Sequence, residues 1–258
     1  MKTLNFKQPT QRRMGHVCTG FLKNVLTKST LLLAAVGIGT GASTSALADV
    51  IFTGSLPSDN LSASATFTDL GGGNLQITLA NTYTGDTPDQ SHVLTALFFS
   101  GVTGLTPVSA LAASGSLQWV AGTSTPAGGM DVGGNWQYLS GSGISSAGFG
   151  VFSSGNFPPS PSTTLDGSAW GLLSAGYAGS ALDGLDGRTY VQDTVVFTLS
   201  GFAGSLSDIT GVSFQYGTTL TEPNVTAVPE PTALIPVALL TAVIWLGGQR
   251  RLFRNRAA

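Results

Sequence analysis

The chain has 258 residues, of which 35 are glycine and only 9% are charged, and its formal net charge is −2. Soluble domains usually carry about 25% charged residues. Because 42% of the chain is hydrophobic, a disordered tail of low hydrophobicity and high charge is excluded. All 13 acidic residues lie between Asp49 and Glu230, a stretch whose only basic residue is Arg188. One arginine cannot neutralise a phosphate backbone, so we exclude nucleic acid as a partner.

The first 48 residues predict a signal peptide. A basic, polar segment reaches Lys28, the apolar run 31–38 follows, and small residues end in Ala46-Leu47-Ala48. Ala46 and Ala48 occupy the two positions that signal peptidase reads, so we expect cleavage after Ala48. The apolar run is short compared with the roughly 20 residues of a membrane span, which favours a cleaved signal over an uncleaved anchor. The expected partners at this stage are the Sec translocon and signal peptidase.

Residues 49–226 predict an all-β ectodomain, either an antiparallel β-sandwich or a jelly-roll-like fold. Apolar and polar residues alternate with a period of two, and the run 93–99 is apolar enough for a strand buried on both faces. Segments rich in Gly, Pro, Asn and Asp separate the strands. The strongest expected strands are residues 61–68, 75–79, 93–99, 191–199 and 212–216.

Two other stretches of the ectodomain are expected to be less regular. Residues 109–113 could form one short helical turn. Residues 122–187 contain a proline-rich break at 157–161, which predicts a long loop region over one end of the sandwich. Since Cys18, the only cysteine, precedes the predicted cleavage site, the exported part has no disulfide and no cysteine metal site.

Few residues of the ectodomain could carry chemistry. His92 is its only histidine, and no Gly-x-Ser-x-Gly motif accompanies it, so we expect a loop-to-strand junction instead of a catalytic triad. Asp183 and Asp186 lie on a Gly-rich segment beside Arg188. The preferred interpretation is a solvated turn. A calcium site or a catalytic carboxylate pair are the alternatives, and no other cofactor or metal site is expected.

Tryptophans gather in the less regular half of the ectodomain. Exposed rings there could stack on sugars, whereas buried rings would fill the core, which is the interpretation that we favour. The three candidates for sugar stacking are Trp119, Trp136 and Trp170.

The last 32 residues, 227–258, have three parts. Pro229-Glu230-Pro231 cannot enter a helix interior and predicts an extended, accessible strand. An apolar stretch at 232–248 is just long enough for a transmembrane helix. A basic tail, 249–258, follows, whose positive charges are expected to keep the terminus on the cytoplasmic side of the membrane. Its stop-transfer residues are Arg250, Arg251 and Arg254.

This arrangement resembles the PEP-CTERM sorting signal of Gram-negative bacteria. The resemblance implies an exosortase that cuts near Pro229, Glu230 and Pro231 and then releases or re-attaches the protein. Residues 94–224 also resemble an ectodomain that recurs among PEP-CTERM proteins, a resemblance that implies no activity. It rests on Phe98-Phe99-Ser100-Gly101, Gly133-Gly134-Asn135-Trp136, Ser213-Phe214-Gln215-Tyr216-Gly217-Thr218 and Glu222-Pro223.

The sequence therefore predicts an exported, exosortase-processed structural protein of the cell surface or of an extracellular matrix, associated with biofilm exopolysaccharide and without catalytic activity. The expected route is an inner-membrane intermediate followed by the cell surface or the medium. Extracellular polysaccharide is a candidate partner. The alternative function is a carbohydrate-binding module. A secreted hydrolase ranks third and last, because acid–base groups are scarce in the ectodomain.

Overall fold

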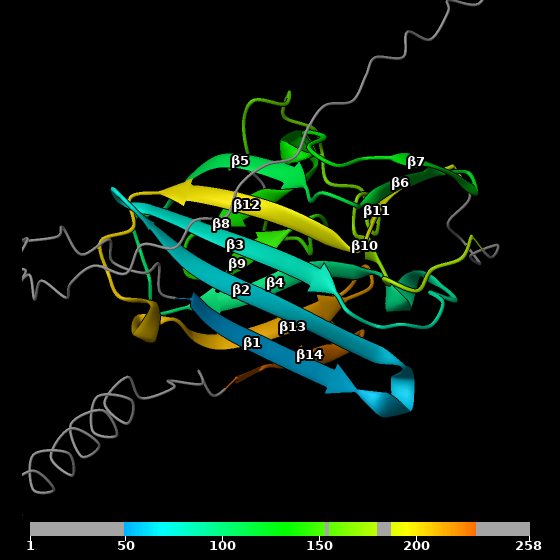
Figure 1. The fold of residues 1–258 in the computed structure, drawn as a ribbon, viewed down its shortest axis with the longest axis horizontal. Coiled ribbons are helices and arrows are strands. Elements are labelled where there is room, and N and C mark those ends of the chain that lie inside the picture. The colour runs from blue at the N-terminus through cyan, green and yellow to red at the C-terminus, as the bar shows by residue number, and fades with distance from the viewer. Residues whose placement is uncertain (1–48, 153–154, 180–186, 231–258) are drawn as a thin grey trace, which may run out of the picture. The chain divides into compact units, whose positions relative to one another are not determined.

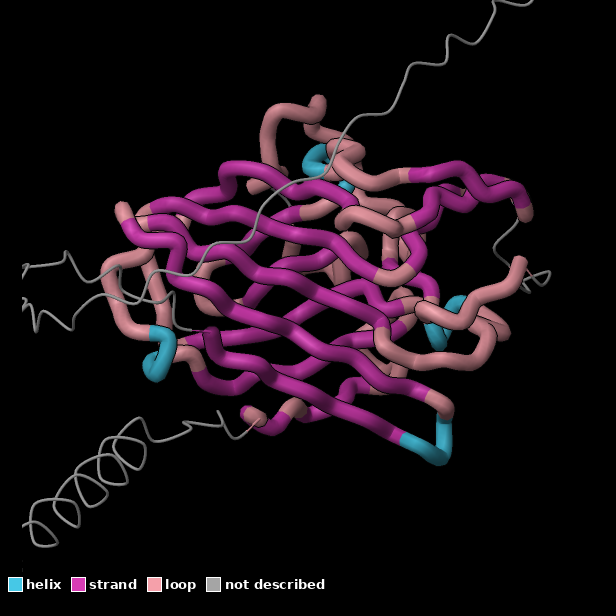
Figure 2. The backbone as a smooth tube through the Cα atoms, viewed as in Figure 1, coloured by secondary structure: helices cyan, strands magenta, loops and turns pink. Residues whose placement is uncertain are grey.

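The computed structural model describes residues 49–152, 155–179 and 187–230. These residues form an all-β unit of two sheets (Figure 1), which confirms the predicted fold class at that level. Figure 2 shows how little of the described chain is helical, and none of its helices is long and apolar enough to cross a membrane. The 3-10 helices of the described part are η1 (Pro57–Asp59), η2 (Gln90–His92), η3 (Gly133–Asn135) and η4 (Leu206–Asp208).

The first sheet has six strands, and every neighbouring pair in it is antiparallel. Its order is β15-β1-β2-β3-β12-β5. The bounds are β1 (Asp49–Leu56), β2 (Leu61–Gly71), β3 (Asn74–Asn81), β5 (Thr106–Ala112), β12 (Thr194–Ser200) and β15 (Val228–Pro229).

The second sheet is mixed, because β10 and β11 pair in parallel. The expectation of a purely antiparallel fold is therefore wrong at this pair. The strand order of the second sheet is β14-β13-β4-β10-β11-β6-β7, and β9 pairs with both β4 and β8. The bounds are β4 (Leu94–Ser100), β6 (Leu117–Val120), β7 (Thr123–Pro126), β8 (Gln137–Leu139), β9 (Gly143–Ser145), β10 (Leu172–Leu173), β11 (Thr189–Gln192), β13 (Thr210–Tyr216) and β14 (Asn224–Thr226).

The predicted period of two is visible in the burial of the central strands. Side chains along β2, β3 and β12 alternate between buried and half-buried, because successive residues of a strand point to opposite faces. The register places Ile77 of β3 opposite Phe67 on one side and Phe197 on the other. Three adjacent strands thus present large apolar side chains to the same face.

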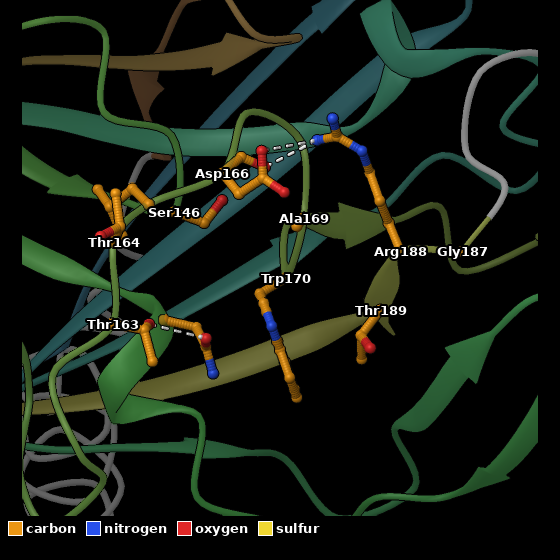
Figure 3. A pocket seen from close by; sticks show the side chains of 11 residues that line it. Ser146, Thr163, Thr164, Asp166, Ala169, Trp170, Gly187, Arg188 and Thr189 are labelled. Carbon is orange, nitrogen blue, oxygen red and sulfur yellow. Dashed lines mark hydrogen bonds and ion pairs between the residues drawn. The ribbon is translucent and has the colours of Figure 1, made fainter.

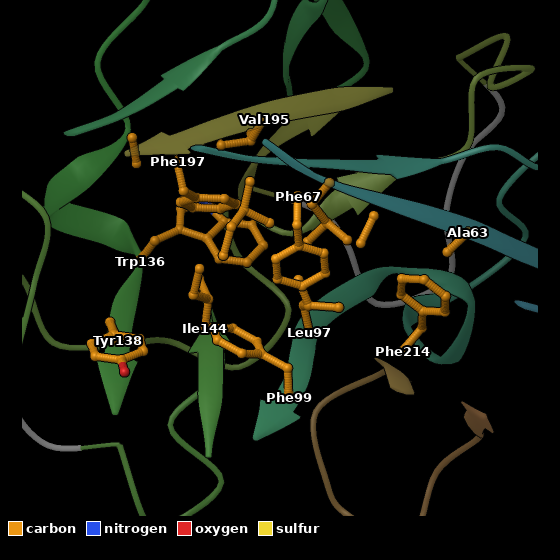
Figure 4. Close-up of a cluster of buried hydrophobic side chains, with 14 of the residues drawn as sticks. Ala63, Phe67, Leu97, Phe99, Trp136, Tyr138, Ile144, Val195, Phe197 and Phe214 are labelled. Atoms are coloured by element: carbon orange, nitrogen blue, oxygen red, sulfur yellow. The ribbon is translucent and has the colours of Figure 1, made fainter. Parts of the chain in front are cut away.

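One hydrophobic core receives side chains from both sheets (Figure 4). Phe67 and Phe197 come from the first sheet, and Leu97 and Phe214 come from the second. Phe67 meets the ring of Phe99 edge to face, with centroids 5.4 Å apart. Burying one such side chain contributes roughly 1.5–3 kcal/mol, so this shared core holds the two sheets together.

The segment 191–199, expected to be one strand, is divided between the two sheets. Asp193 has a φ of 82°, a left-handed conformation that interrupts the strand. Its N–H donates to the carbonyl of Leu173, and its own carbonyl accepts from the N–H of Asn81, so the crossing backbone remains paired. The chain therefore leaves the second sheet at Gln192 and enters the first at Thr194.

Two expectations about irregular segments are also wrong. Residues 109–112 belong to strand β5 and residue 113 follows its end, so no helical turn forms there, because pairing with β12 outweighs a weak local preference. Residues 122–187 are not simply a loop over one end. Their described part contains β7 to β10 and buries Trp136 and Phe157 in the shared core.

Candidate functional site

His92 does not form a relay of the Ser-His-Asp kind. Its Nδ1 lies 2.9 Å from Asp89 Oδ1 and 3.2 Å from Ser91 Oγ, whereas in a triad the acid and the nucleophile contact opposite ring nitrogens. The N–H of Ser91 donates to Asp89 Oδ1 over 2.8 Å, so the cluster caps η2, which leads into β4. Within the described residues, no three His, Cys, Asp or Glu side chains gather as metal ligands.

The carboxyl group of Asp89 has a lowered pKa. Partial burial raises this pKa, but hydrogen bonds from Ser91 and His92, together with the charge of His92, lower it by more. The carboxylate is thus held in its ionised form beside the cap. This is a structural use of the only histidine of the ectodomain.

Trp136 and Trp119 are poorly placed for sugar stacking. The Trp136 side chain is fully buried and meets the ring of Phe197 with centroids 5.1 Å apart, so its assignment as a stacking candidate is wrong. Trp119 is half-buried; its Nε1–H donates to Gln192 Oε1 over 2.8 Å, and its ring lies edge to face on Tyr177. These contacts fix Trp119 against the second sheet.

Trp170 lines a pocket of about 230 Å³ (Figure 3), which we call the Trp170 pocket. The residue is half-buried, packs against the shared core and has a φ of 63°. Its backbone N–H donates to the carbonyl of Thr189 over 2.6 Å, which ties the left-handed residue to the start of β11. The pocket is lined by Asn135, Ser146, Thr163, Thr164, Leu165, Asp166, Ala169, Trp170, Gly187, Arg188 and Thr189.

Charged side chains of both signs, together with polar ones, line the Trp170 pocket. Arg188 Nη1 donates to the backbone carbonyl of Asp166 over 2.8 Å and lies 3.6 Å from the Asp166 carboxylate. Opposite them, Thr163 Oγ1 donates to Asn135 Oδ1 over 3.1 Å. A hydrogen-bonding ligand in this pocket would meet a guanidinium donor, a carboxylate acceptor, an amide and hydroxyls, in a lining that also includes Trp170.

The sequence pointed to Trp170 and Arg188 but not to this grouping. Among the described residues, the ion-pair partner of Arg188 is Asp166, 22 positions earlier. The available signal was that Arg188 is the single basic residue of the acidic stretch 49–230. Asp183 and Asp186, the calcium or catalytic candidates, lie outside the described residues.

A second candidate site lies where the described chain begins and ends. Strand β15 pairs with β1, with Pro229 opposite Phe52, and the N–H of Glu230 donates to the carbonyl of Ile51 over 2.7 Å. Pro229 and Glu230 are exposed, in the extended form that proline favours. Sequence patterns do not reveal this pairing, because β15 has only two residues.

Residues 224–230 bridge the two sheets, and we call them the strap. β14 pairs with β13 of the second sheet, and β15 pairs with β1 of the first. Between them, the N–H of Ala227 donates to the carbonyl of Val212 over 3.0 Å. Val225 is the buried side chain of the strap, whereas Val228 is 63% exposed. The strap thus closes one edge of the core mainly through its backbone.

The other predicted processing residues lie outside the described part of the chain. They are Ala46, Ala48, Pro231, Arg250, Arg251 and Arg254. No protein-family model, curated protein or solved structure matches this chain. Its function is therefore inferred from its residues and their geometry.

Proposed function

We propose that this protein is an exported structural protein of the cell surface or extracellular matrix, processed at both ends and not catalytic. Its ectodomain would be a β-sandwich that serves as a scaffold in an exopolysaccharide matrix. Signal peptidase would act at its N-terminal side and an exosortase at Pro229-Glu230-Pro231. The observation that carries the proposal is the pairing of β1 with β15.

This pairing brings together the two ends at which processing is expected. β1 starts at Asp49, the residue that would follow signal-peptide cleavage, and β15 ends at Pro229, the first residue of the sorting motif. Because the strands are antiparallel, the start of β1 and the end of β15 lie at the same end of the first sheet. This arrangement suits a domain whose two termini both lead toward one membrane.

The position of the motif also suits an enzyme that reads an extended peptide. Pro229 lacks an N–H, so the described hydrogen bond that holds the motif to β1 comes from Glu230. Extended peptides are commonly bound through their backbone groups. A short, exposed edge strand could be transferred from β1 to the sorting enzyme at the cost of few contacts.

The intact mass of the native protein tests this proposal. We expect a mature chain that starts at Asp49 and ends near the Pro229-Glu230-Pro231 motif in cells with the sorting enzyme. Cells that lack the enzyme should retain the C-terminal segment. A Glu230→Ala variant should behave like the enzyme deletion, and Asp59→Ala, which removes an exposed carboxylate of η1 away from the motif, is the matched control. Recovery of an uncut, full-length chain from the cytosol would overturn the proposal.

A second candidate function, carbohydrate binding, is favoured by the Trp170 pocket. Trp170 lines this pocket together with the ion pair of Asp166 and Arg188. A matrix protein with such a site would hold polysaccharide directly, in addition to forming a scaffold.

A further inference from the structure

We propose that the Trp170 pocket binds one neutral pyranose unit of a polysaccharide. The inference deepens the second candidate function by naming the site and the class of sugar. The inference depends on the proposed surface localisation only in one respect, which is where the sugar would come from. Four features of the pocket support it: its size, its chemistry, its charge and its fixed geometry.

The size of the pocket favours a single ring. Its volume is about 230 Å³, below the roughly 300–1,000 Å³ of pockets that enclose drug-sized ligands. The described residues therefore leave room for one small ring or a chain terminus. A longer saccharide would continue outward from the pocket into solvent.

The lining matches the two kinds of surface that a pyranose presents. Its C–H face is apolar and suits the indole face of Trp170. Each of its hydroxyl groups both donates and accepts hydrogen bonds, and the rim of the pocket offers both partners. Arg188 is the donor, the carboxylate of Asp166 is the acceptor, and Asn135 and Thr163 add an amide and a hydroxyl.

The charge of the pocket favours a neutral sugar over an anionic one. The guanidinium of Arg188 already lies 3.6 Å from the carboxylate of Asp166, so the pair offsets its own charge. The ectodomain contains no other basic residue and is acidic as a whole. A uronic acid would therefore meet a field that repels it. The Asp166 side chain is 74% exposed, so it can turn toward a ligand at little cost.

The backbone around Trp170 is fixed in an unusual conformation. Its φ of 63° is an outlier for a bulky L-amino acid, and such residues cluster at ligand sites because the surrounding structure must hold them there. Here the bonds of Trp170 to Thr189 and of Gly171 to Ser168 do so. The backbone that carries the ring is thus set before a ligand arrives, which lowers the entropy cost of binding.

The probes for a direct test are the methyl glycosides of glucose, galactose and mannose. Glucuronic acid and glucosamine serve as the anionic and cationic comparisons. Saturation-transfer NMR would follow binding to the full-length chain, held in a detergent without a sugar headgroup. We expect at least one neutral glycoside to bind with a Kd on the order of millimolar, more tightly than glucuronic acid does.

Variants place the binding in the Trp170 pocket. We expect Trp170→Ala to weaken binding about tenfold or more. Asp166→Ala, which removes an exposed side chain and should leave the fold intact, is expected to weaken it by a smaller factor. Trp119→Ala is the matched control, because this tryptophan is also half-buried but lies outside the pocket. Thermal unfolding of each variant verifies its fold.

Three results would overturn the inference. They are no saturation transfer to any neutral glycoside, tighter binding of glucuronic acid than of the neutral glycosides, or equal losses of sugar affinity in the Trp119 and Asp166 variants. The Asp166 variant keeps the test decisive if Trp170→Ala does not fold. The intact-mass measurement of the preceding section is independent of sugar binding. Failure of the sugar site and failure of the export proposal can therefore be distinguished.

Discussion

The strap and the loop-rich region of residues 122–187 are held in opposite ways. The strap joins the two sheets through backbone pairing, and Val225 is its one side chain buried in the core. The described part of the loop-rich region has little regular pairing but buries Trp136 and Phe157 completely. A regular edge needs few side chains, whereas an irregular segment depends on them.

The reason is that buried backbone groups must find partners. In the loop-rich region side chains supply them. Asn156 Nδ2 donates to the carbonyl of Gly134 over 2.6 Å, and Asn156 Oδ1 accepts from Gln137 Nε2 over 2.8 Å. Two backbone segments of this region also pack closely, because a Cβ on Gly133 would lie 2.2 Å from the carbonyl oxygen of Phe157. The strap should therefore open at low cost, and the loop-rich region should not.

The largest expected effect is at Trp136. Replacing this buried ring with alanine should destabilise the protein by about 3–5 kcal/mol, the cost of a large core truncation. Phe67→Ala, in the regular part of the same core, is the matched comparison and should cost a similar amount. Urea unfolding of both variants measures the difference. A loss below about 1 kcal/mol for Trp136→Ala would show that the loop-rich region is not part of the core.

The next effect is expected at Gln192, whose side chain holds irregular backbone to β11. Its Nε2 donates to the carbonyls of Ala175 and Tyr177, and its Oε1 accepts from Trp119. Gln192→Ala leaves these groups without their partner and should cost about 2–3 kcal/mol. Gln118→Ala, on the neighbouring strand β6, is the control and should cost much less. Similar losses in both variants would contradict this role.

The sequence predicted the regular strands well, because alternation reports which face is buried. The expected segments 61–68 and 75–79 lie in β2 and β3, and 93–99 lies in β4 apart from its first residue; β4 is buried on both faces as expected. The sequence did not separate β11 from β12, since one left-handed residue, Asp193, changes the sheet without changing the pattern.

The candidate sites were harder to predict than the strands. Trp170 was one of three equivalent tryptophans in the sequence, and only packing distinguishes it from the buried Trp136. The contact between Asp166 and Arg188 joins irregular segments 22 positions apart that carry no periodic signal. The predicted sorting motif follows from its neighbours in the chain, but the pairing of Pro229 with β1 depends on a register between segments at opposite ends of the described residues.

Two valines of the strap test how little side-chain burial it uses. Val225 is 6% exposed, and Val225→Ala should cost about 1–2 kcal/mol through two lost methyl groups. Val228→Ala changes the exposed valine and should be close to neutral. Hydrogen exchange should show the amide of Glu230 opening more readily than that of Phe157 in the wild-type chain. Equal protection of these two amides would contradict the contrast between the regions.

The smallest effect is expected at Asp89, whose side chain caps η2 outside both regions. The folded state lowers the pKa of this carboxyl, so its contribution to stability is present above the unfolded value of about 3.9 and is lost as the pH falls through the folded value. An Asp89→Asn variant would keep an oxygen for the Ser91 N–H but lose the charge. Because the Asp89 side chain is 45% exposed, solvent screening should keep the cost of this substitution below about 1 kcal/mol at pH 7. Unfolding measured from pH 7 to pH 3 should show this cost shrinking toward acid, and a cost that grows instead would mean that the carboxylate does not stabilise the cap.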